Sequence, residues 1–149
     1  MSIAARIRDV FRGPTPLRWV PQEEGMGCAV ACLAMLLGQS YWGARSLLPH
    51  FNAIEGTCST DVLRVLGEYG WAYASKYPHY SPEQRDRRVW PIRPFAPIHF
   101  CAARVGGWHA ILMFADGTVL DPLRYPSAGR RTLDDYTDIL EIHGLWRVA

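Results

Sequence analysis

A cysteine at the start of an apolar segment has the clearest chemical potential of any residue in this chain. Every residue from Cys28 to Leu37 is apolar or a cysteine, and Gly38 ends the segment. This composition predicts a helix that is buried on all sides. The first turn of a helix carries unpaired N–H groups and a partial positive charge, which favour a thiolate over a thiol. Cys28 is therefore a candidate nucleophile, and the alternative is that it is a small buried apolar residue.

A nucleophilic thiol needs a base, and the base needs a group that orients it. Among the five histidines, His109 stands at the start of a strand-like segment, after two glycines. Asp121 ends the next such segment, beyond an Asp-Gly pair that is typical of a hairpin turn. Residues 109 and 121 are thus expected near the same open end of two strands. If both side chains share a face, Asp121 can hold one ring nitrogen and leave the other for Cys28.

Residues around these three are candidates for binding substrate. Gln22 lies six residues before Cys28, and its side-chain amide could loop back toward the thiol to stabilise the oxyanion that develops during the reaction. A peptide cleft is lined by apolar and aromatic side chains, and we expect Trp108, beside His109, to lie at its edge. The alternative for Trp108 is an aromatic residue in the core under the sheet. Gly27 and Ala29, which flank Cys28, complete the expected substrate-binding set.

Composition indicates one globular domain over residues 1–149, with residues 1–19 as an N-terminal extension. The formal net charge of +2 gives no indication of nucleic-acid binding. No apolar run reaches the length of a membrane span, and arginines interrupt the N-terminal residues where a signal peptide would need an apolar core. We expect a cytoplasmic protein, with later export by a dedicated system left open. The sequence carries no signal for an oligomeric state.

The four cysteines predict neither a disulfide framework nor a metal site. A reduced compartment is the simpler assumption for a chain without secretion signals. Zinc sites usually pair their ligands at short spacings, whereas these cysteines are scattered over predicted core elements: Cys28, Cys32, Cys58 and Cys101. We therefore expect no metal and no cofactor.

Helical patterns come first in the chain and strand patterns follow. Helices are expected over residues 3–12, 28–37, 41–48 and 59–69, the last with Ser59 as N-cap and with Val62, Leu66 and Tyr69 on one face. Strands are expected over 71–77, 98–104, 108–114, 118–121 and 139–148, with a surface crossing over 78–95 and a helical turn over 132–136. This order predicts an α+β domain of two segregated layers.

Several motifs together resemble a known family. The chain is similar to the papain-like peptidases that remove double-glycine leaders from bacteriocins, and the resemblance covers roughly residues 20–125. Its motifs are Gln22 and Cys28 separated by five residues, the Ala-Val-Ala-Cys-Leu-Ala-Met-Leu-Leu-Gly segment that follows, Gly56-Thr-Cys-Ser59, Gly70-Trp71, Ala96-Pro-Ile-His99, Trp108-His-Ala-Ile-Leu112 and Val119-Leu-Asp-Pro122.

The resemblance implies a papain-like fold, with N-terminal helices packed on a C-terminal antiparallel sheet. It also implies roles: Cys28 as nucleophile, His109 as general base, Asp121 as the acid that orients it and Gln22 as oxyanion donor. A peptide or protein is the implied substrate. The chain departs from the family at positions 27 and 29, where Gly27 replaces the usual Asp or Asn and Ala29 replaces the usual Gly. Most family members are the front part of a membrane transporter, whereas this sequence stops where the peptidase domain would. We therefore expect a free-standing relative.

Two other functions fit the same residues. Cell-wall amidases and effector-type hydrolases or acyl transferases also use a cysteine at a helix end and a histidine on a strand. A non-catalytic binding module on a peptidase fold is the third interpretation.

Overall fold

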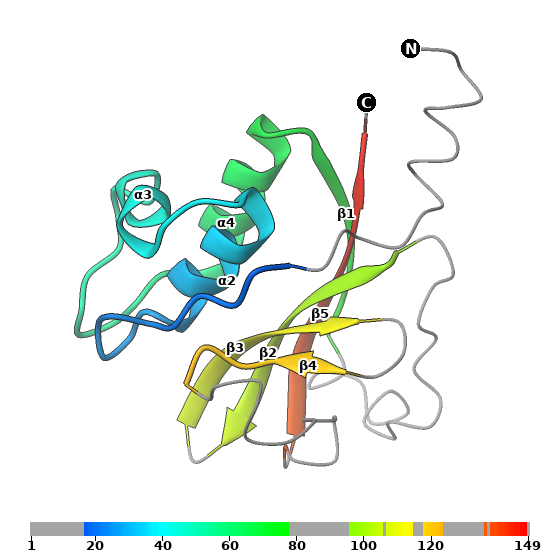
Figure 1. Cartoon of the computed structure of the whole chain (residues 1–149). Coiled ribbons are helices and arrows are strands. Elements are labelled where there is room, and N and C mark those ends of the chain that lie inside the picture. The colour runs from blue at the N-terminus through cyan, green and yellow to red at the C-terminus, as the bar shows by residue number, and fades with distance from the viewer. Residues whose placement is uncertain are drawn as a thin grey trace.

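The computed structural model describes residues 17–77, 96–105, 107–114, 118–123, 136 and 138–148. The helix predicted over 3–12, the crossing predicted over 78–95 and most of the turn predicted over 132–136 lie outside these residues. Figure 1 shows three helices gathered on one side of a sheet.

The helices follow the sequence pattern closely. They are α2 (Cys28–Leu37), α3 (Tyr41–Ser46) and α4 (Ser59–Glu68). In α3 the Ser40 hydroxyl accepts a hydrogen bond from the Gly43 N–H, as expected of an N-cap serine. This helix ends earlier than predicted, because Leu47 already serves as its C-cap.

Helix α2 lies at the centre of the helical layer. Eight of its ten residues are buried, from Ala29 to Leu36. Gly38 ends it with φ at 65°, a left-handed conformation that glycine adopts without steric penalty. The buried helix thereby fixes the position of the residue that begins it, Cys28.

Two details of α4 differ from the prediction. Cys58, not Ser59, is the N-cap, and the Ser59 hydroxyl donates to Glu141 on a distant strand. Val62 and Leu66 are buried as predicted, but Tyr69 is 44% exposed because it stands at the C-cap, where the chain leaves the helix. The Ser59 side chain therefore bonds to Glu141 instead of capping the helix that it begins.

The sheet contains five antiparallel strands: β1 (Trp71–Lys76), β2 (Ile98–Val105), β3 (Gly107–Phe114), β4 (Val119–Leu120) and β5 (Asp138–Arg147). Their spatial order is β1-β5-β2-β3-β4, so the last strand lies between the first two. The pairing of β2 with β5 is irregular between Ala102 and Ala103, which pair with Glu141 and Ile139.

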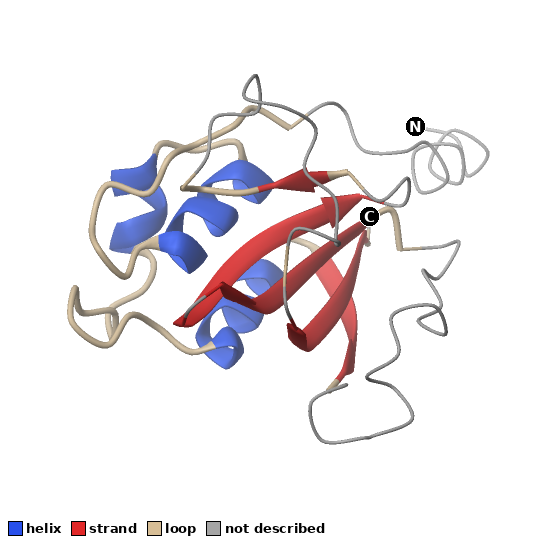
Figure 2. Ribbon diagram, turned by 90° about the horizontal axis from the view of Figure 1, so that it is seen from below, coloured by secondary structure: helices blue, strands red, loops and turns tan. Residues whose placement is uncertain are grey.

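Buried side chains cover both faces of the sheet. The larger cluster joins the helices to one face through residues such as Phe100, Ala110 and Leu145. A smaller cluster covers the other face and includes Ile111, Ile139 and Tyr136. Figure 2 shows the twisted strands from below, beside the helices. The structure confirms the predicted α+β arrangement of helices packed on an antiparallel sheet.

No helix in the described ranges is both long enough and apolar enough to cross a bilayer.

Candidate active site

Cys28 is the first residue of α2 and is partly exposed, whereas the residues after it are buried. Gly27 precedes it as the N-cap and offers no side chain to cap the helix. The ring and hydroxyl of Tyr41 occupy the space that a Cβ atom at position 27 would need. Any side chain at position 27 would therefore require the Tyr41 ring to move.

The Cys28 sulfur is held by three groups. Burial would raise the pKa of the thiol, but the hydrogen bond from the His109 ring and the N–H groups of Ala110 and Ala29 outweigh it and lower that pKa below its ordinary value of 9.0. The Ala29 contact is the one expected at the start of a helix. The Ala110 contact comes from β3 and joins the helical layer to the sheet.

The contact between α2 and β3 depends on the short length of β4. Strand β4 pairs only with Leu112 and Met113, so the first residues of β3 lie at the edge of the sheet formed by the described strands. At such an edge, backbone N–H groups on the outer side have no ladder partner. The N–H of Ala110 is therefore available to contact Cys28.

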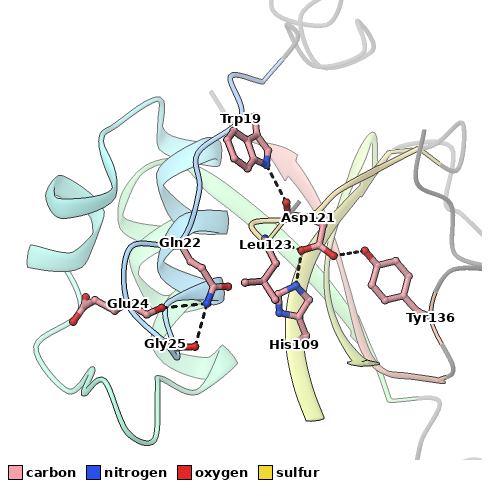
Figure 3. A network of polar contacts seen from close by, with 8 residues as sticks. All are labelled: Trp19, Gln22, Glu24, Gly25, His109, Asp121, Leu123 and Tyr136. Atoms are coloured by element: carbon pink, nitrogen blue, oxygen red, sulfur yellow. Dashed lines mark hydrogen bonds and ion pairs between the residues drawn. The ribbon is translucent and has the colours of Figure 1, made fainter. Parts of the chain in front are cut away.

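His109 and Asp121 form a short, buried pair. The Nε2 atom of His109 lies 2.6 Å from Oδ1 of Asp121, and the two side chains are 8% and 4% exposed. Figure 3 shows the second ring nitrogen turned away from the carboxylate, and this nitrogen is the one available to Cys28. The order thiol, imidazole, carboxylate matches the predicted order of Cys28, His109 and Asp121.

The charges of the three groups support one another. Burial would lower the pKa of His109, but its hydrogen bonds to Asp121 and Cys28 raise that pKa from 6.5 to about 9. Burial would raise the pKa of Asp121, but hydrogen bonds from His109, Tyr136 and the Leu123 N–H lower it. The site therefore favours a thiolate beside an imidazolium, with a carboxylate behind it.

Tyr136 completes the carboxylate end of the site and was not among the predicted residues. Its hydroxyl donates to Oδ2 of Asp121 at 2.7 Å, while the Leu123 N–H donates to Oδ1 at 2.9 Å. A lone tyrosine carries no motif, so only the folded chain could bring it to a residue fifteen positions earlier.

The segment before α2 is tied to the turn that carries Asp121. The indole N–H of Trp19 donates to the Asp121 carbonyl at 2.9 Å, and the Gln22 N–H donates to the Pro122 carbonyl at 3.2 Å. Trp19, predicted as the end of an N-terminal extension, thus belongs to the structure of the site.

The Gln22 side chain lies in the loop that leads to Cys28. Its amide nitrogen donates to the carbonyls of Glu24 and Gly25, both at 3.1 Å (Figure 3). Its Oε1 atom is buried without a hydrogen-bond partner among the described residues. In this arrangement the amide holds the loop, and it must leave these carbonyls before it can bind an oxyanion.

A pocket of about 300 Å³ opens beside the thiol and the imidazole. Cys28, Ala29 and His109 lie on one side of it, and Trp108, which is 55% exposed, lies at its edge. Trp108 and Ala29, two of the residues predicted to bind substrate, thus line this pocket. Gly27 does not line this pocket, because Tyr41 covers it.

The remaining cysteines do not resemble Cys28. Burial raises the pKa of Cys32 well above its ordinary value and that of Cys101 to about 12. All four cysteines are free. In the ranges that the structure describes, no three His, Cys, Asp or Glu side chains converge as a metal site would require.

Comparison with known proteins gives matches in structure but not in sequence. No family model matches the chain, and no curated protein matches its sequence. A solved double-glycine motif protease from an AMS/PCAT transporter, in complex with its leader peptide, superposes with a TM-score of 0.55 at 15% identity. That match covers 92% of this chain and 96% of the other.

A second solved structure gives the same result. It is the peptidase domain of Streptococcus ComA, a bifunctional ABC transporter of a quorum-sensing pathway. It superposes with a TM-score of 0.59 at 16% identity, over 87% of this chain and 97% of the other. The fold is that of the double-glycine peptidase domains. In this peptidase fold, Cys28 begins the buried helix and His109 lies on the edge of the sheet that faces it.

Proposed function

We propose that this protein is a cysteine peptidase that hydrolyses a peptide bond through the Cys28 thiolate. One observation carries the proposal: a thiol of lowered pKa contacts an imidazole whose other nitrogen is bound to a buried carboxylate, beside an open pocket. Nucleophilic catalysis by cysteine needs these three groups in this order.

The first half of the reaction forms a thioester. The Cys28 thiolate attacks the carbonyl carbon of the scissile bond, and the electron pair of the C=O bond moves to oxygen. As the tetrahedral intermediate collapses, the C–N bond breaks and the imidazolium of His109 gives its proton to the leaving amine. The products are an acyl-enzyme, a neutral imidazole and a free amine.

The second half releases the acid. Neutral His109 takes a proton from water, and the resulting hydroxide attacks the thioester carbonyl. The C–S bond breaks, and the thiolate and imidazolium are restored beside the carboxylic acid product. Asp121 keeps the His109 ring in one orientation throughout, and Tyr136 and Leu123 keep Asp121 in place.

The oxyanion requires donors near the attacked carbonyl. We propose that Gln22 supplies one when its amide leaves the carbonyls of Glu24 and Gly25 on substrate binding. Two features of the loop permit this movement. A side-chain position at Gly25 is surrounded by open space, and the Gln22 Oε1 atom has no hydrogen bond that the movement would break.

The proposed substrate is a peptide or protein segment, and the proposed compartment is the cytoplasm. One of the similar structures is bound to a leader peptide. A segment with two adjacent glycines is therefore the first substrate to test. The methyl group of Ala29 lines the pocket, and it narrows the approach to the backbone there.

Alkylation followed by mass mapping tests the nucleophile. The chain is treated with iodoacetamide at neutral pH, and the four cysteines are compared by rate. Cys28 is expected to react first, and His109→Ala is expected to slow it at least tenfold, because the imidazolium that stabilises the thiolate is lost.

A second assay separates peptidase from amidase chemistry. Quenched fluorescent peptides containing Gly-Gly are compared with peptidoglycan fragments, using Cys28→Ser as the inactive control. Cleavage of the peptides alone is expected. The proposal is wrong if Cys58 or Cys101 reacts before Cys28, or if the peptides stay intact while the fragments are cleaved.

A further inference from the structure

A carboxylate lies on the far side of the same pocket, away from the reacting groups. Glu141, on β5, lines the pocket together with Cys28 and His109, although nothing in the proposed reaction uses it. It pairs with Ala102 across the β2–β5 ladder, and Ala102 pairs with Ala110 on β3. Neighbouring strands lie about 4.8 Å apart, so Glu141 is roughly 10 Å across the sheet from Ala110, whose N–H contacts the thiol.

The Glu141 carboxylate is held in one orientation from two sides. Its Oε2 atom accepts a hydrogen bond from the Ser59 hydroxyl at the start of α4. The same oxygen lies 3.1 Å from Nε2 of His143, two residues along β5. The other oxygen, Oε1, has no hydrogen-bond partner among the described residues, and it is accessible to solvent. This oxygen is therefore available to a ligand.

His143 does not neutralise this carboxylate. Burial lowers the pKa of His143 below 6.5, more than the neighbouring Glu141 raises it. A neutral imidazole has one N–H, and the carboxylate can only accept, so Nε2 donates to Glu141 while Nδ1 accepts from the Ser75 hydroxyl at 2.7 Å. In the described part of the chain Glu141 has no Lys or Arg partner, and its negative charge remains for the pocket.

The rest of the pocket suits a long side chain with a charged end. Its walls include the apolar side chains of Met26, Phe100 and Ala102, and a second carboxylate, Glu55, also lines it. Lysine and arginine place an aliphatic stem along apolar surface and a cation at its end. The exposed indole of Trp108 at the edge can also contact a cation.

We propose that Glu141 makes the cleft selective for a substrate with a lysine or arginine side chain close to the cleaved bond. This inference rests on the proposed peptidase function and adds its substrate class. An extended peptide advances about 3.4 Å per residue, so a residue one or two positions from the cleaved bond brings a long side chain to Glu141. Glu141 binds the side chain and takes no part in bond breaking.

Paired peptides test the selectivity. A parent peptide containing Gly-Gly carries Lys, Met or Glu at each of three positions on either side of the glycines. Cleavage by the full chain is measured as kcat/KM, and binding to Cys28→Ala is measured by tryptophan fluorescence. At one position at least, Lys is expected to exceed Met about tenfold in both measurements, since a hydrogen bond to a charged group contributes about that much.

Two Glu→Gln changes provide the matched comparison. Glu141→Gln keeps an oxygen that accepts from Ser59 and His143 but removes the charge, and it is expected to reduce the Lys-to-Met ratio to below about twofold. Glu68→Gln makes the same chemical change on the exposed face of α4, where Glu68 pairs with Arg64, and should keep the wild-type ratio. Thermal unfolding of both variants shows whether the fold is intact.

The outcomes separate this inference from the proposed function. Cleavage with the same Lys-to-Met ratio in wild type and Glu141→Gln overturns the inference and leaves the peptidase intact. A Glu141-dependent preference in binding without any cleavage supports the inference and overturns the peptidase. Absence of both binding and cleavage overturns both.

Discussion

Two buried histidines, His109 and His143, each contact a carboxylate and a hydroxyl or thiol, yet their pKa values move in opposite directions. His109 lies between Asp121 and Cys28, and both neighbours favour its charged form, so its pKa is raised to about 9. His143 lies between Glu141 and Ser75, and burial lowers its pKa by more than its single acidic neighbour, Glu141, raises it. A carboxylate alone does not make a buried imidazole a cation, whereas a carboxylate and an ionisable thiol together do.

The surroundings of the two acids account for the rest of the difference. Asp121 accepts hydrogen bonds from Tyr136 and the Leu123 N–H as well as from His109, which lowers its pKa. Glu141 accepts from Ser59 and His143 on a single oxygen. Both oxygens of Asp121 accept hydrogen bonds from the protein, whereas Oε1 of Glu141 is available to a ligand. The first set is suited to chemistry and the second to binding.

The largest expected effect is that of His109→Gln, with His143→Gln as the comparison. His109→Gln should reduce peptide cleavage by about 10³-fold, because general acid–base catalysis and the stabilised thiolate are both lost. The rate of Cys28 alkylation is the second readout, and His143→Gln should alter it far less. Equal slowing in the two variants would contradict the division of roles between the histidines.

A titration sharpens the contrast in charge. Followed by NMR of the ring protons, His109 should titrate at about 9 and His143 below 6.5. Cleavage should rise with pH as the Cys28 thiolate forms below 9.0 and decline above about 9, when His109 loses the proton that the leaving amine needs. Two histidines titrating together near 6.5 would show that the thiolate and imidazolium do not stabilise each other.

The same shifts set the sign of the stability change with pH. The folded pKa of His109 is raised, so its contribution is complete below pH 6.5 and is lost as pH rises through about 9. The folded pKa of Asp121 is lowered, so its contribution is present above pH 3.8 and is lost as pH falls through the folded value. His143 is held neutral, and folding therefore becomes less favourable as pH falls below 6.5.

The smallest expected effect is that of Tyr136→Phe. The change removes the hydroxyl that donates to Asp121 and keeps the buried ring. Unfolding in urea should show a loss of about 1 kcal/mol, the usual contribution of one hydrogen bond, and the titration of His109 should move only slightly because the Leu123 N–H still holds the carboxylate. A fall of the His109 pKa to 6.5 in Tyr136→Phe would show that the Tyr136 hydroxyl, not the Leu123 N–H, keeps Asp121 charged and in place.

The sequence by itself determined the local elements and the members of the central group. An unbroken apolar run ended by Gly38 specified α2 within its observed bounds. The Asp-Gly pair predicted two neighbouring strands that bring His109 and Asp121 near the same end, and in the structure His109 lies on β3 while Asp121 directly follows β4. These features depend on near neighbours in the chain, where periodicity and turn chemistry act directly.

Only the tertiary structure decided how distant residues meet. The insertion of β5 between β1 and β2 carries Glu141 to the pocket, with His143 beside it, and it draws Ser59 away from the cap that its local sequence favoured. The folded chain likewise brings Tyr136 to Asp121 and directs the Gln22 amide to the loop carbonyls. The Ser59–Glu141 and Tyr136–Asp121 hydrogen bonds join polar groups that are far apart in sequence and that meet only in the folded chain.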